Sequence, residues 1–249
     1  MLLMIRENYD EICRVAAQRF ADQIRKKPTC VLGLATGSTP LGIYRELIKE
    51  HKENDLDFSL VQTFNLDEYV GLPREHSQSY FYFMKTNFFD HINIHPSSVH
   101  IPNGMAEDIE QECLDYEKKI VDAGGIDLQI PGIGSNGHIA FNEPFSSLGS
   151  RTRIKTLTEK TRKDNARFFD SMDDVPVYAI TMGVGTIMES RSIILMASGE
   201  NKTWAIKNTV EGPITAKVPA TIVQLHRDAT ILMDRDASSE LTQAKTIAE

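Results

Sequence analysis

Cysteine is scarce in this sequence: Cys13, Cys30 and Cys113 are the three among 249 residues. They lie far apart and none belongs to a C-x-x-C pattern. This spacing excludes a disulfide framework and the common thiolate metal sites. We therefore expect three reduced, buried thiols, with the cytoplasm as the compartment of the protein.

Long apolar runs and excess positive charge are also missing. No apolar run approaches the roughly 18 residues of a membrane span, and the N-terminal residues turn polar too soon for a signal peptide. The 27 Lys and Arg against 35 Asp and Glu give a net charge of −8. Nucleic acid and anionic membranes bind positive surfaces, so we expect neither as a partner. An anionic substrate would need a local pocket of cationic and N–H groups.

What the sequence does contain is an alternation of strand and helix patterns. Ile12, Ala16, Phe20 and Ile24 recur four residues apart, which predicts one helical face. Strands are predicted at Cys30–Ala35, Leu60–Leu66, Ile126–Ile130, Tyr178–Met182, Ser192–Ala197 and Thr230–Asp234. Helices are predicted at Asn8–Lys27, Leu41–Lys52, Gln78–Phe89, Glu107–Ala123, Thr161–Phe169 and Asn201–Glu211.

This alternation favours an α/β fold: one domain over residues 1–249 with an open, mostly parallel sheet and helices on both faces, as in Rossmann-like folds. Ligands bind outside the carboxyl ends of the strands in such sheets. Functional residues should therefore follow predicted strands.

The segment ATGSTP at residues 35–40 follows a predicted strand and opens a predicted helix. Gly37 lets the backbone approach a ligand, and Ser38 and Thr39 offer hydroxyl groups beside the free N–H groups of a helix N-terminus. Pro40 suits the first helical position. The segment predicts a phosphate site, although an ordinary strand-to-helix turn with an N-cap explains it equally well. No G-K-[ST] follows, so it is not a Walker A loop.

Two adjacent acids, Asp67 and Glu68, stand where the next predicted strand ends. Neighbouring side chains on an extended segment point in opposite directions, so one of the two can face a ligand crevice. A carboxylate there can be a general base or can bind a metal or a sugar hydroxyl. Taken alone, an Asp that caps a loop is the simpler interpretation.

The segment GIGSNGHIAFNEP at residues 132–144 combines glycines with His138, a proton shuttle near neutral pH. Asn136 and Glu143 can orient its imidazole and fix its tautomer. The dinucleotide-binding spacing G-x-G-x-x-G fails at His138. A single histidine is more often structural, but the glycines and the nearby acid favour a functional one here.

Basic residues offer further candidates for anion binding. Arg167 and Lys202 can each close a phosphate pocket, although a solvated surface charge is the simpler interpretation of both. Arg151, Arg153 and Lys155 alternate along one face of a strand, and we expect an edge strand protected by charge rather than a second anion site. The remaining histidines show no ligand spacing, so we predict no metal site. The aromatic residues between 80 and 89 are expected in the core.

Together these segments are far more specific than each one alone. The order TGSTP, FNLDEYVGL, GIGSNGHIAFNEP, SRTRIKTL, ARFF and SGENK resembles the glucosamine-6-phosphate deaminase family from about residue 30 to about residue 235. The resemblance implies conversion of glucosamine 6-phosphate and water to fructose 6-phosphate and ammonia, with a small sugar phosphate as the ligand. No cofactor is implied, because the aldehyde formed by ring opening already acidifies the C2 proton.

The resemblance also implies roles for matching residues. Asp67 would carry a proton from C2 to C1 of the opened sugar, and His138 would open the pyranose ring. Glu143 and Asn136 would orient or tune the imidazole. The 6-phosphate would be held by the loop at Gly37 and by four side chains: Ser38, Thr39, Arg167 and Lys202.

Two departures from the family pattern matter. Some members have Asp where this chain has Asn136, so we expect an altered pH dependence rather than lost activity. In hexameric members, N-acetylglucosamine 6-phosphate activates at a subunit-interface site, whose residues Ser146, Arg153 and Lys155 match. The short C-terminus resembles that of unregulated members, which favours a monomer without activation and leaves both questions open.

Two rival functions remain at this stage. A 6-phosphogluconolactonase has a related fold but would lack the F-N-E-P sequence that contains Glu143. A sugar-phosphate sensor would carry a DNA-binding module, for which a first strand near residue 30 leaves no room. A sensor would also have no need to keep Asp67, His138 and Glu143 together.

Overall fold

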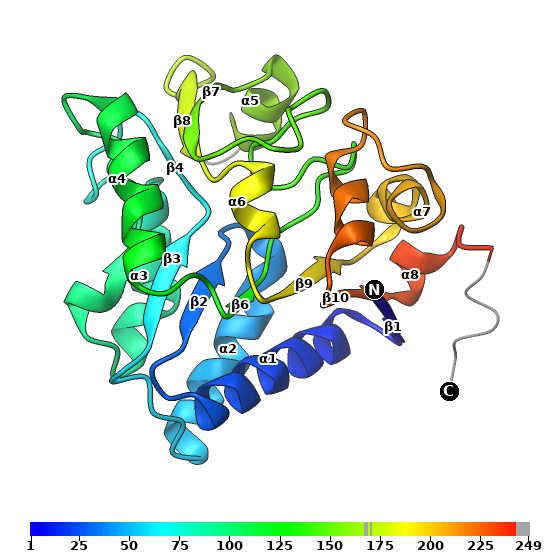
Figure 1. The fold of residues 1–249 in the computed structure, drawn as a ribbon, viewed down its shortest axis with the longest axis horizontal. Helices are drawn as coiled ribbons and strands as arrows, with labels where there is room; N and C mark the ends of the chain where they lie inside the picture. Colours follow the sequence, from blue (N-terminus) through cyan, green and yellow to red (C-terminus); the bar gives the residue numbers. More distant parts are fainter. Residues whose placement is uncertain (167–168, 170, 243–249) are drawn as a thin grey trace.

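The computed structural model describes residues 1–166, 169 and 171–242 of the chain. Its centre is a seven-stranded sheet in the order β1-β10-β9-β6-β2-β3-β5, and each neighbouring pair of strands is parallel (Figure 1). The strands are β1 (Leu2–Arg6), β2 (Val31–Leu34), β3 (Gln62–Asn65), β5 (Val99–His100), β6 (Leu128–Gln129), β9 (Ser192–Ala197) and β10 (Ala229–Asp234). The predicted fold class is confirmed.

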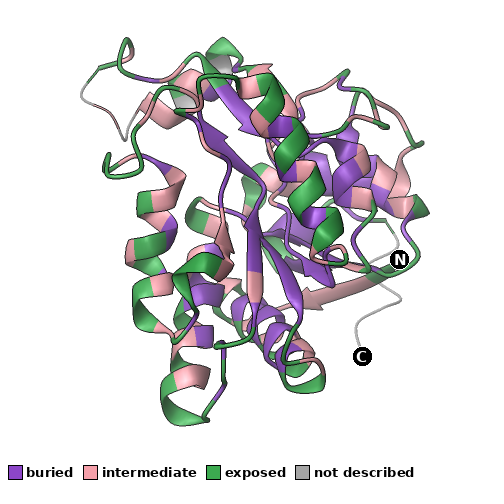
Figure 2. Cartoon of the chain, turned by 60° about the vertical axis from the view of Figure 1, so that its left-hand side comes forward, coloured by how far each residue is buried: buried purple, intermediate pink, exposed green. Residues whose placement is uncertain are grey.

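Helices cover both faces of this sheet, and each face has its own core. One core includes residues of α1 (Tyr9–Lys26), α2 (Ser38–Glu53) and α3 (Tyr80–Asn87). The other includes residues of α4 (Ile109–Asp122), α6 (Val184–Met188), α7 (Thr203–Glu211) and α8 (Arg235–Ser238). Successive residues of β10 alternate between the two: Leu232 belongs to the first core, and Ile231 and Met233 to the second. Figure 2 shows the buried strands enclosed by helices whose outer sides are exposed.

A second, three-stranded antiparallel sheet lies above the carboxyl ends of the main strands (Figure 1). It has the order β4 (Asp67–Tyr69), β8 (Tyr178–Thr181), β7 (Arg153–Thr156). In the described part of the chain β7 is an edge strand, as its alternating basic residues predict. Helix α5 (Glu159–Asn165) follows β7. Short 3₁₀ helices are η1 (Phe89–His91), η2 (Pro96–Ser98), η4 (Glu200–Lys202) and η5 (Pro219–Leu225).

Local sequence signals explain where several helices begin and end. The Asn8 side chain accepts a hydrogen bond from the Glu11 N–H at 3.0 Å, which satisfies one of the unpaired donors at the start of α1. Asp108 caps α4 in the same way, through the N–H of Gln111. Gly124, with a φ of 87°, follows the end of α4 as its sequence predicts.

Three sequence predictions need correction, and one strand of the main sheet was not predicted. The first strand is β1 at Leu2–Arg6, not the strand near residue 30; its apolar run LLMI is short, and its partner, β10, lies at the other end of the chain. Strand β5, with two residues, is too short to produce a pattern. Helix α2 begins at Ser38, so Pro40 is its third residue rather than its first. Helix α3 begins only at Tyr80, because Ser79 is its N-cap.

Candidate active site

A cavity of about 770 Å³ opens at the carboxyl ends of the central strands. Its walls come from the loops that follow β2, β3, β6 and β9, and from residues of α3 and α5. The structure brings most of the residues singled out by sequence to this one cavity: Gly37, Ser38, Thr39, Asp67, Asn136, His138 and Lys202. These candidate residues lie after strands of the main sheet or in the segments that follow them, as expected.

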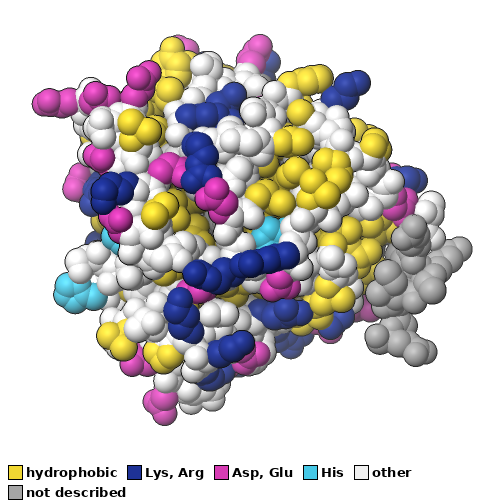
Figure 3. All heavy atoms as spheres, viewed as in Figure 1, with side chains coloured by type: hydrophobic (Ala, Val, Ile, Leu, Met, Phe, Trp, Pro, Cys, Tyr) yellow, Lys and Arg dark blue, Asp and Glu magenta, His cyan; other side chains and the backbone are white. Residues whose placement is uncertain are grey.

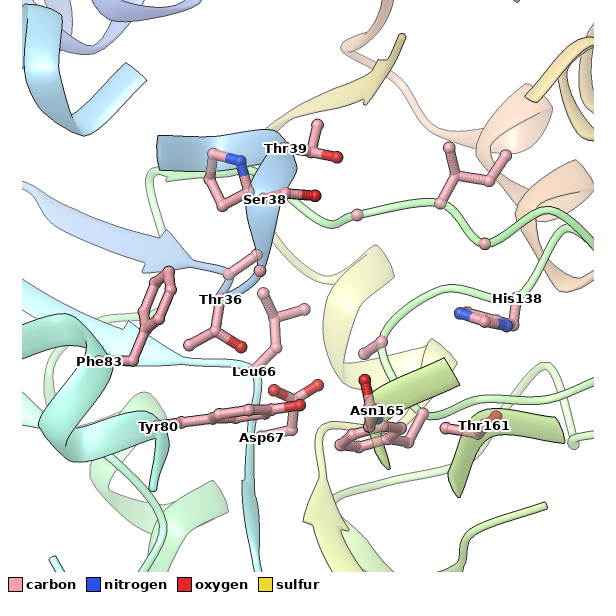
Figure 4. Close-up of a pocket in the computed structure, with 18 of the residues that line it drawn as sticks. Thr36, Ser38, Thr39, Leu66, Asp67, Tyr80, Phe83, His138, Thr161 and Asn165 are labelled. Atoms are coloured by element: carbon pink, nitrogen blue, oxygen red, sulfur yellow. The ribbon is translucent and has the colours of Figure 1, made fainter. Parts of the chain in front are cut away.

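The upper wall of the cavity in Figure 4 is the N-terminus of α2. Gly37 takes a φ of 100°, a conformation that favours glycine, and no side chain caps the first turn of this helix. N-capping therefore does not explain the Ser38 and Thr39 hydroxyls. The Tyr9 hydroxyl fixes this turn through the carbonyl oxygens of Ser38 and Thr39, at 3.0 and 2.9 Å. An uncapped helix N-terminus that faces a cavity can bind an anion.

Lys202 brings a positive charge to the same cavity. Its amine donates to the carbonyl oxygen of Ile133 at 2.8 Å, which ties it to the glycine loop that follows β6. Arg167, the other cation expected here, lies outside the described residues.

Asp67 and Glu68 separate as the alternation of an extended segment predicts. Glu68 turns away and accepts hydrogen bonds from the N–H groups of Tyr69, Tyr80 and Phe81 at 2.8 to 2.9 Å, the last two at the start of α3. Asp67 faces the cavity and is 7% exposed (Figure 4). Burial, followed by the nearby charge of Glu68, raises the pKa of Asp67 to about 8.

The glycine loop that follows β6 fits closely around His138. A Cβ at Gly134 would lie 2.1 Å from the imidazole, so a side chain there would displace the ring. Ala140 follows with a φ of 51°, an unusual conformation for a residue with a Cβ. The Asn142 side chain anchors the segment through the carbonyl oxygens of Ile139 and Met182, at 2.9 and 2.8 Å. The imidazole is therefore held in place by backbone shape.

His138, Glu143 and Asn136 form a cluster beside the cavity. Oε2 of Glu143 lies 3.6 Å from Nδ1 of His138 and accepts a hydrogen bond from the Asn136 amide at 2.9 Å. Oε1 accepts a hydrogen bond from the Thr161 hydroxyl. Burial alone would raise the pKa of Glu143, but the imidazole and these donors outweigh it and lower the pKa to about 2. Glu143 is therefore an anion throughout the physiological pH range.

Some lining residues were missed by the sequence analysis. Tyr80 and Phe83 were expected in the core, but both line the cavity, and Tyr80 stacks on Phe141 at an interplanar angle of 12°. Thr161 and Asn165 line it from α5. A cap signal was available for Thr161, since Thr158 stands three residues before it, but no sequence pattern links it to Glu143.

The residues that match an activator site lie elsewhere. Ser146 is buried and its hydroxyl has no hydrogen-bond partner among the described residues. Arg153 donates to the side-chain oxygen of Asn142 at 2.8 Å, while the side-chain nitrogen of Asn142 makes the two contacts with carbonyl oxygens. Lys155 lies half-buried on the same strand. None of the three lines the described cavity.

No group of three or more described His, Cys, Asp or Glu residues is arranged to hold a metal ion. No helix in the part of the chain that the structure describes has the length and apolar character to cross a membrane.

A doubly wound sheet with an uncapped helix N-terminus, a buried carboxylate and a histidine around one cavity is typical of proteins that can bind a small anion and move protons on it. The chain belongs to the family of glucosamine-6-phosphate isomerases/6-phosphogluconolactonase, whose sequence model it matches over residues 6–232. The family resemblance inferred from the motifs is confirmed.

Within that family, the chain is much more similar to the deaminases than to a lactonase of known structure. A glucosamine-6-phosphate deaminase of Thermoanaerobacter sp. (strain X514) is 57% identical over 96% of this chain and 94% of its own length. The solved structure of a monomeric glucosamine-6-phosphate deaminase is 48% identical, covers 96% of this chain and 99% of its own, and superimposes with a TM-score of 0.94. A 6-phosphogluconolactonase from Trypanosoma cruzi shares the fold, with a TM-score of 0.78 over 97% of each chain, but is 19% identical.

Proposed function

We propose that this protein is a glucosamine-6-phosphate deaminase, which converts D-glucosamine 6-phosphate and water to D-fructose 6-phosphate and ammonia. The relatives at 48 and 57% identity carry that activity in their names. The observation that carries the proposal is the arrangement of one cavity: the Asp67 carboxylate and the His138 imidazole lie on different walls of it, below an uncapped helix N-terminus (Figure 4). An acid–base pair beside an anion site suits a sugar phosphate.

The 6-phosphate binds at the start of α2. The N–H groups of its first turn and the Ser38 and Thr39 hydroxyls donate to the phosphate oxygens, with Gly37 allowing close approach. Lys202 supplies a positive charge from the neighbouring wall. Arg167 is assigned to the same group by its sequence motif. The doubly charged phosphate needs such donors, because the net charge of the chain is −8.

His138 opens the pyranose ring. The imidazole takes the proton of the anomeric hydroxyl and returns one to the ring oxygen, which gives the open-chain aldehyde. Glu143, an anion beside Nδ1, stabilises the imidazolium that forms between the two transfers. Asn136 holds the carboxylate in place. A neutral amide at residue 136 adds no second negative charge beside the imidazole.

Asp67 then moves the C2 proton. The new aldehyde acidifies this proton; the carboxylate removes it and delivers a proton to C1, so that the C2–N bond becomes an imine. Water adds to that imine and ammonia leaves, which produces the ketone of fructose 6-phosphate. A carboxylate with a pKa raised to about 8 is a strong enough base to take the proton and also holds it long enough to return it.

We further propose that the chain acts as a single domain and a monomer in the cytoplasm, without a nucleic-acid partner or activation by N-acetylglucosamine 6-phosphate. The similarity to a monomeric deaminase over nearly the whole chain supports the first part. Lys and Arg side chains are interspersed with Asp and Glu on the face seen in Figure 3, which suits the absence of a nucleic-acid partner.

The decisive experiment is ammonia release from glucosamine 6-phosphate in metal-free buffer, with chelator added. Non-phosphorylated glucosamine is the control for the phosphate site, and 6-phosphogluconolactone is the rival substrate. We expect rapid release that requires the phosphate and ignores the chelator. Hydrolysis of the lactone without ammonia release would contradict the proposal and move the function to the sister activity.

A further inference from the structure

Thr161 lies at the start of α5, where this helix meets the cluster around His138. The residue is 8% exposed and lines the cavity on the same side as the imidazole (Figure 4). Its hydroxyl donates to Oε1 of Glu143 at 2.5 Å. A helix outside the main sheet thus contacts the carboxylate that faces the imidazole.

The direction of this hydrogen bond is fixed by its neighbours. Glu143 is ionised and can only accept, so the Thr161 hydroxyl must donate its proton to the carboxylate. The Thr158 hydroxyl donates to the Thr161 oxygen at 2.9 Å and accepts the Thr161 N–H at 3.1 Å. The N-cap of α5 and the donor to Glu143 are therefore one hydrogen-bonded unit, and Thr161 contacts Glu143 only when α5 is in this position.

Two neutral hydrogen-bond donors keep the Glu143 carboxylate from contacting the imidazole directly. Oε1 is held by Thr161, and Oε2 by the Asn136 amide at 2.9 Å. The distance from Oε2 of Glu143 to Nδ1 of His138 is 3.6 Å, which is longer than a hydrogen bond. Nδ1 is buried and has no hydrogen-bond partner among the described residues. Glu143 is the carboxylate within 4 Å of the ring in the described part of the chain, while Asp67 and Lys202 line other walls.

We propose that Thr161 is a positioning residue for ring opening: from the docked α5 helix it holds Glu143 back from His138, so that the imidazole stays free to exchange its proton with the sugar. The inference rests on the proposed function, since it assigns ring opening to His138. Without the Thr161 hydroxyl, the carboxylate is free to close on Nδ1, and direct contact stabilises the imidazolium more strongly than the 3.6 Å separation of the parent does. The histidine then gives up its proton less readily and ring opening slows.

The kinetic test compares three single variants with the parent on glucosamine 6-phosphate. Thr161→Val keeps the shape but loses the donor, and Thr161→Ser keeps the donor. Glu159→Gln breaks an exposed ion pair of α5 with Lys163 and leaves Thr158, Thr161 and Glu143 in place. We expect Thr161→Val to lower kcat about 10-fold or more while KM stays within about 3-fold. Thr161→Ser and Glu159→Gln should stay within about 3-fold of the parent in kcat. If Thr161→Val does not fold, Thr161→Ala serves in the same measurements.

A double-mutant cycle separates this role from simple helix stability. If Thr161 acts through Glu143, Thr161→Val should have almost no further effect on kcat in a Glu143→Gln background. If the losses of kcat in the two single variants multiply in the double variant, the proposal is overturned, because Thr161 then acts independently of the carboxylate.

A histidine titration by NMR tests the geometry without turnover. The His138 signal is assigned by its loss in His138→Gln. We expect its midpoint to rise by about half a pH unit or more in Thr161→Val and to stay unchanged in Thr161→Ser and Glu159→Gln. An unchanged or lowered midpoint in Thr161→Val would overturn the proposal. A parent enzyme without deaminase activity would instead contradict the proposed function, and the titration would still report on the contact between Thr161 and Glu143.

Discussion

Two carboxylates of the same site, Asp67 and Glu143, have opposite surroundings. Asp67 is buried beside a like charge and receives no side-chain hydrogen bond from the described residues, so its pKa rises to about 8. Glu143 is also largely buried, but the His138 imidazole and two donors lower its pKa to about 2. Burial acts in the same direction on both, and the neighbours decide the outcome.

Because of this difference, one kind of functional group has two roles in a single cavity. A carboxylate that titrates near 8 can take a proton from carbon and return it, whereas one that titrates near 2 remains an anion and stabilises its neighbour. The roles follow from which side chains reach each group. Changing those side chains one at a time tests this division of roles.

The largest effect is expected for Asp67→Asn, which should lower kcat about 10³-fold or more because the proton carrier is gone. Binding of a sugar phosphate, measured by calorimetry, should persist. The matched control is Asp127→Asn at the other end of the sheet, where a buried carboxylate pairs with Lys27 and Arg191. That variant should melt at a lower temperature with kcat nearly unchanged. Turnover of Asp67→Asn within a few-fold of the parent would remove Asp67 from the mechanism.

A smaller loss is expected for Glu143→Gln, about 10- to 100-fold in kcat. The amide keeps the volume and one acceptor but no longer stabilises the imidazolium of His138. The measurement is steady-state kcat and KM with glucosamine 6-phosphate. A loss as large as that of Asp67→Asn would contradict the division of roles between the two carboxylates.

Lys202→Ala should raise KM about 10-fold and leave kcat nearly unchanged, since the phosphate contact is the same in the ground and transition states. The control is Lys49→Ala, an exposed lysine on α2 that pairs loosely with Glu53 at 4.0 Å. An unchanged KM for Lys202→Ala would place the phosphate elsewhere.

The pH profile of kcat/KM tests the raised pKa of Asp67. Because the ionised carboxylate is the base, activity should rise with pH until about 8. Glu68→Gln removes the nearby charge that contributes to this shift, so the rising limb should move to lower pH. The substrate phosphate titrates near pH 6 and gives a separate inflection. A limb that stays in place would mean that Glu68 has no part in the shift.

The smallest effect concerns stability. A carboxyl whose folded pKa is raised from an ordinary 3.8 to about 8 contributes stability that is present below about pH 4 and is lost as the pH rises through 8. Asp67→Asn removes this loss. Its melting temperature relative to the parent should therefore increase from pH 5 to pH 8, and a constant difference would argue against a buried ionisable Asp67.

The sequence predicted the parts of this site that follow a repeating rule. Strand alternation separated Asp67 from Glu68, and the structure confirms that only Asp67 of the two lines the described cavity. The rule that ligands bind after strands located the loops at Gly37 and His138. Each of these inferences needs one segment and its periodicity alone.

Contacts between distant elements could not be predicted in this way. Thr161 lies 18 residues after Glu143 and in a different element, helix α5, so no sequence spacing predicts the contact. Tyr80 belongs to an apolar, aromatic segment that is typical of a core, and its position at the cavity depends on how α3 packs under Glu68. Strand β1 was missed because its partner, β10, lies at the other end of the chain.

The contrast between the two carboxylates is tested most directly by carbon-13 NMR of the parent enzyme, labelled in its Asp and Glu side chains. The signals are assigned with Asp67→Asn and Glu143→Gln. We predict that the Asp67 carboxyl titrates near pH 8, while Glu143 remains ionised down to the lowest pH at which the protein stays folded. Titration of both groups near pH 4 would contradict the assignment of base and anion on which the proposed mechanism depends.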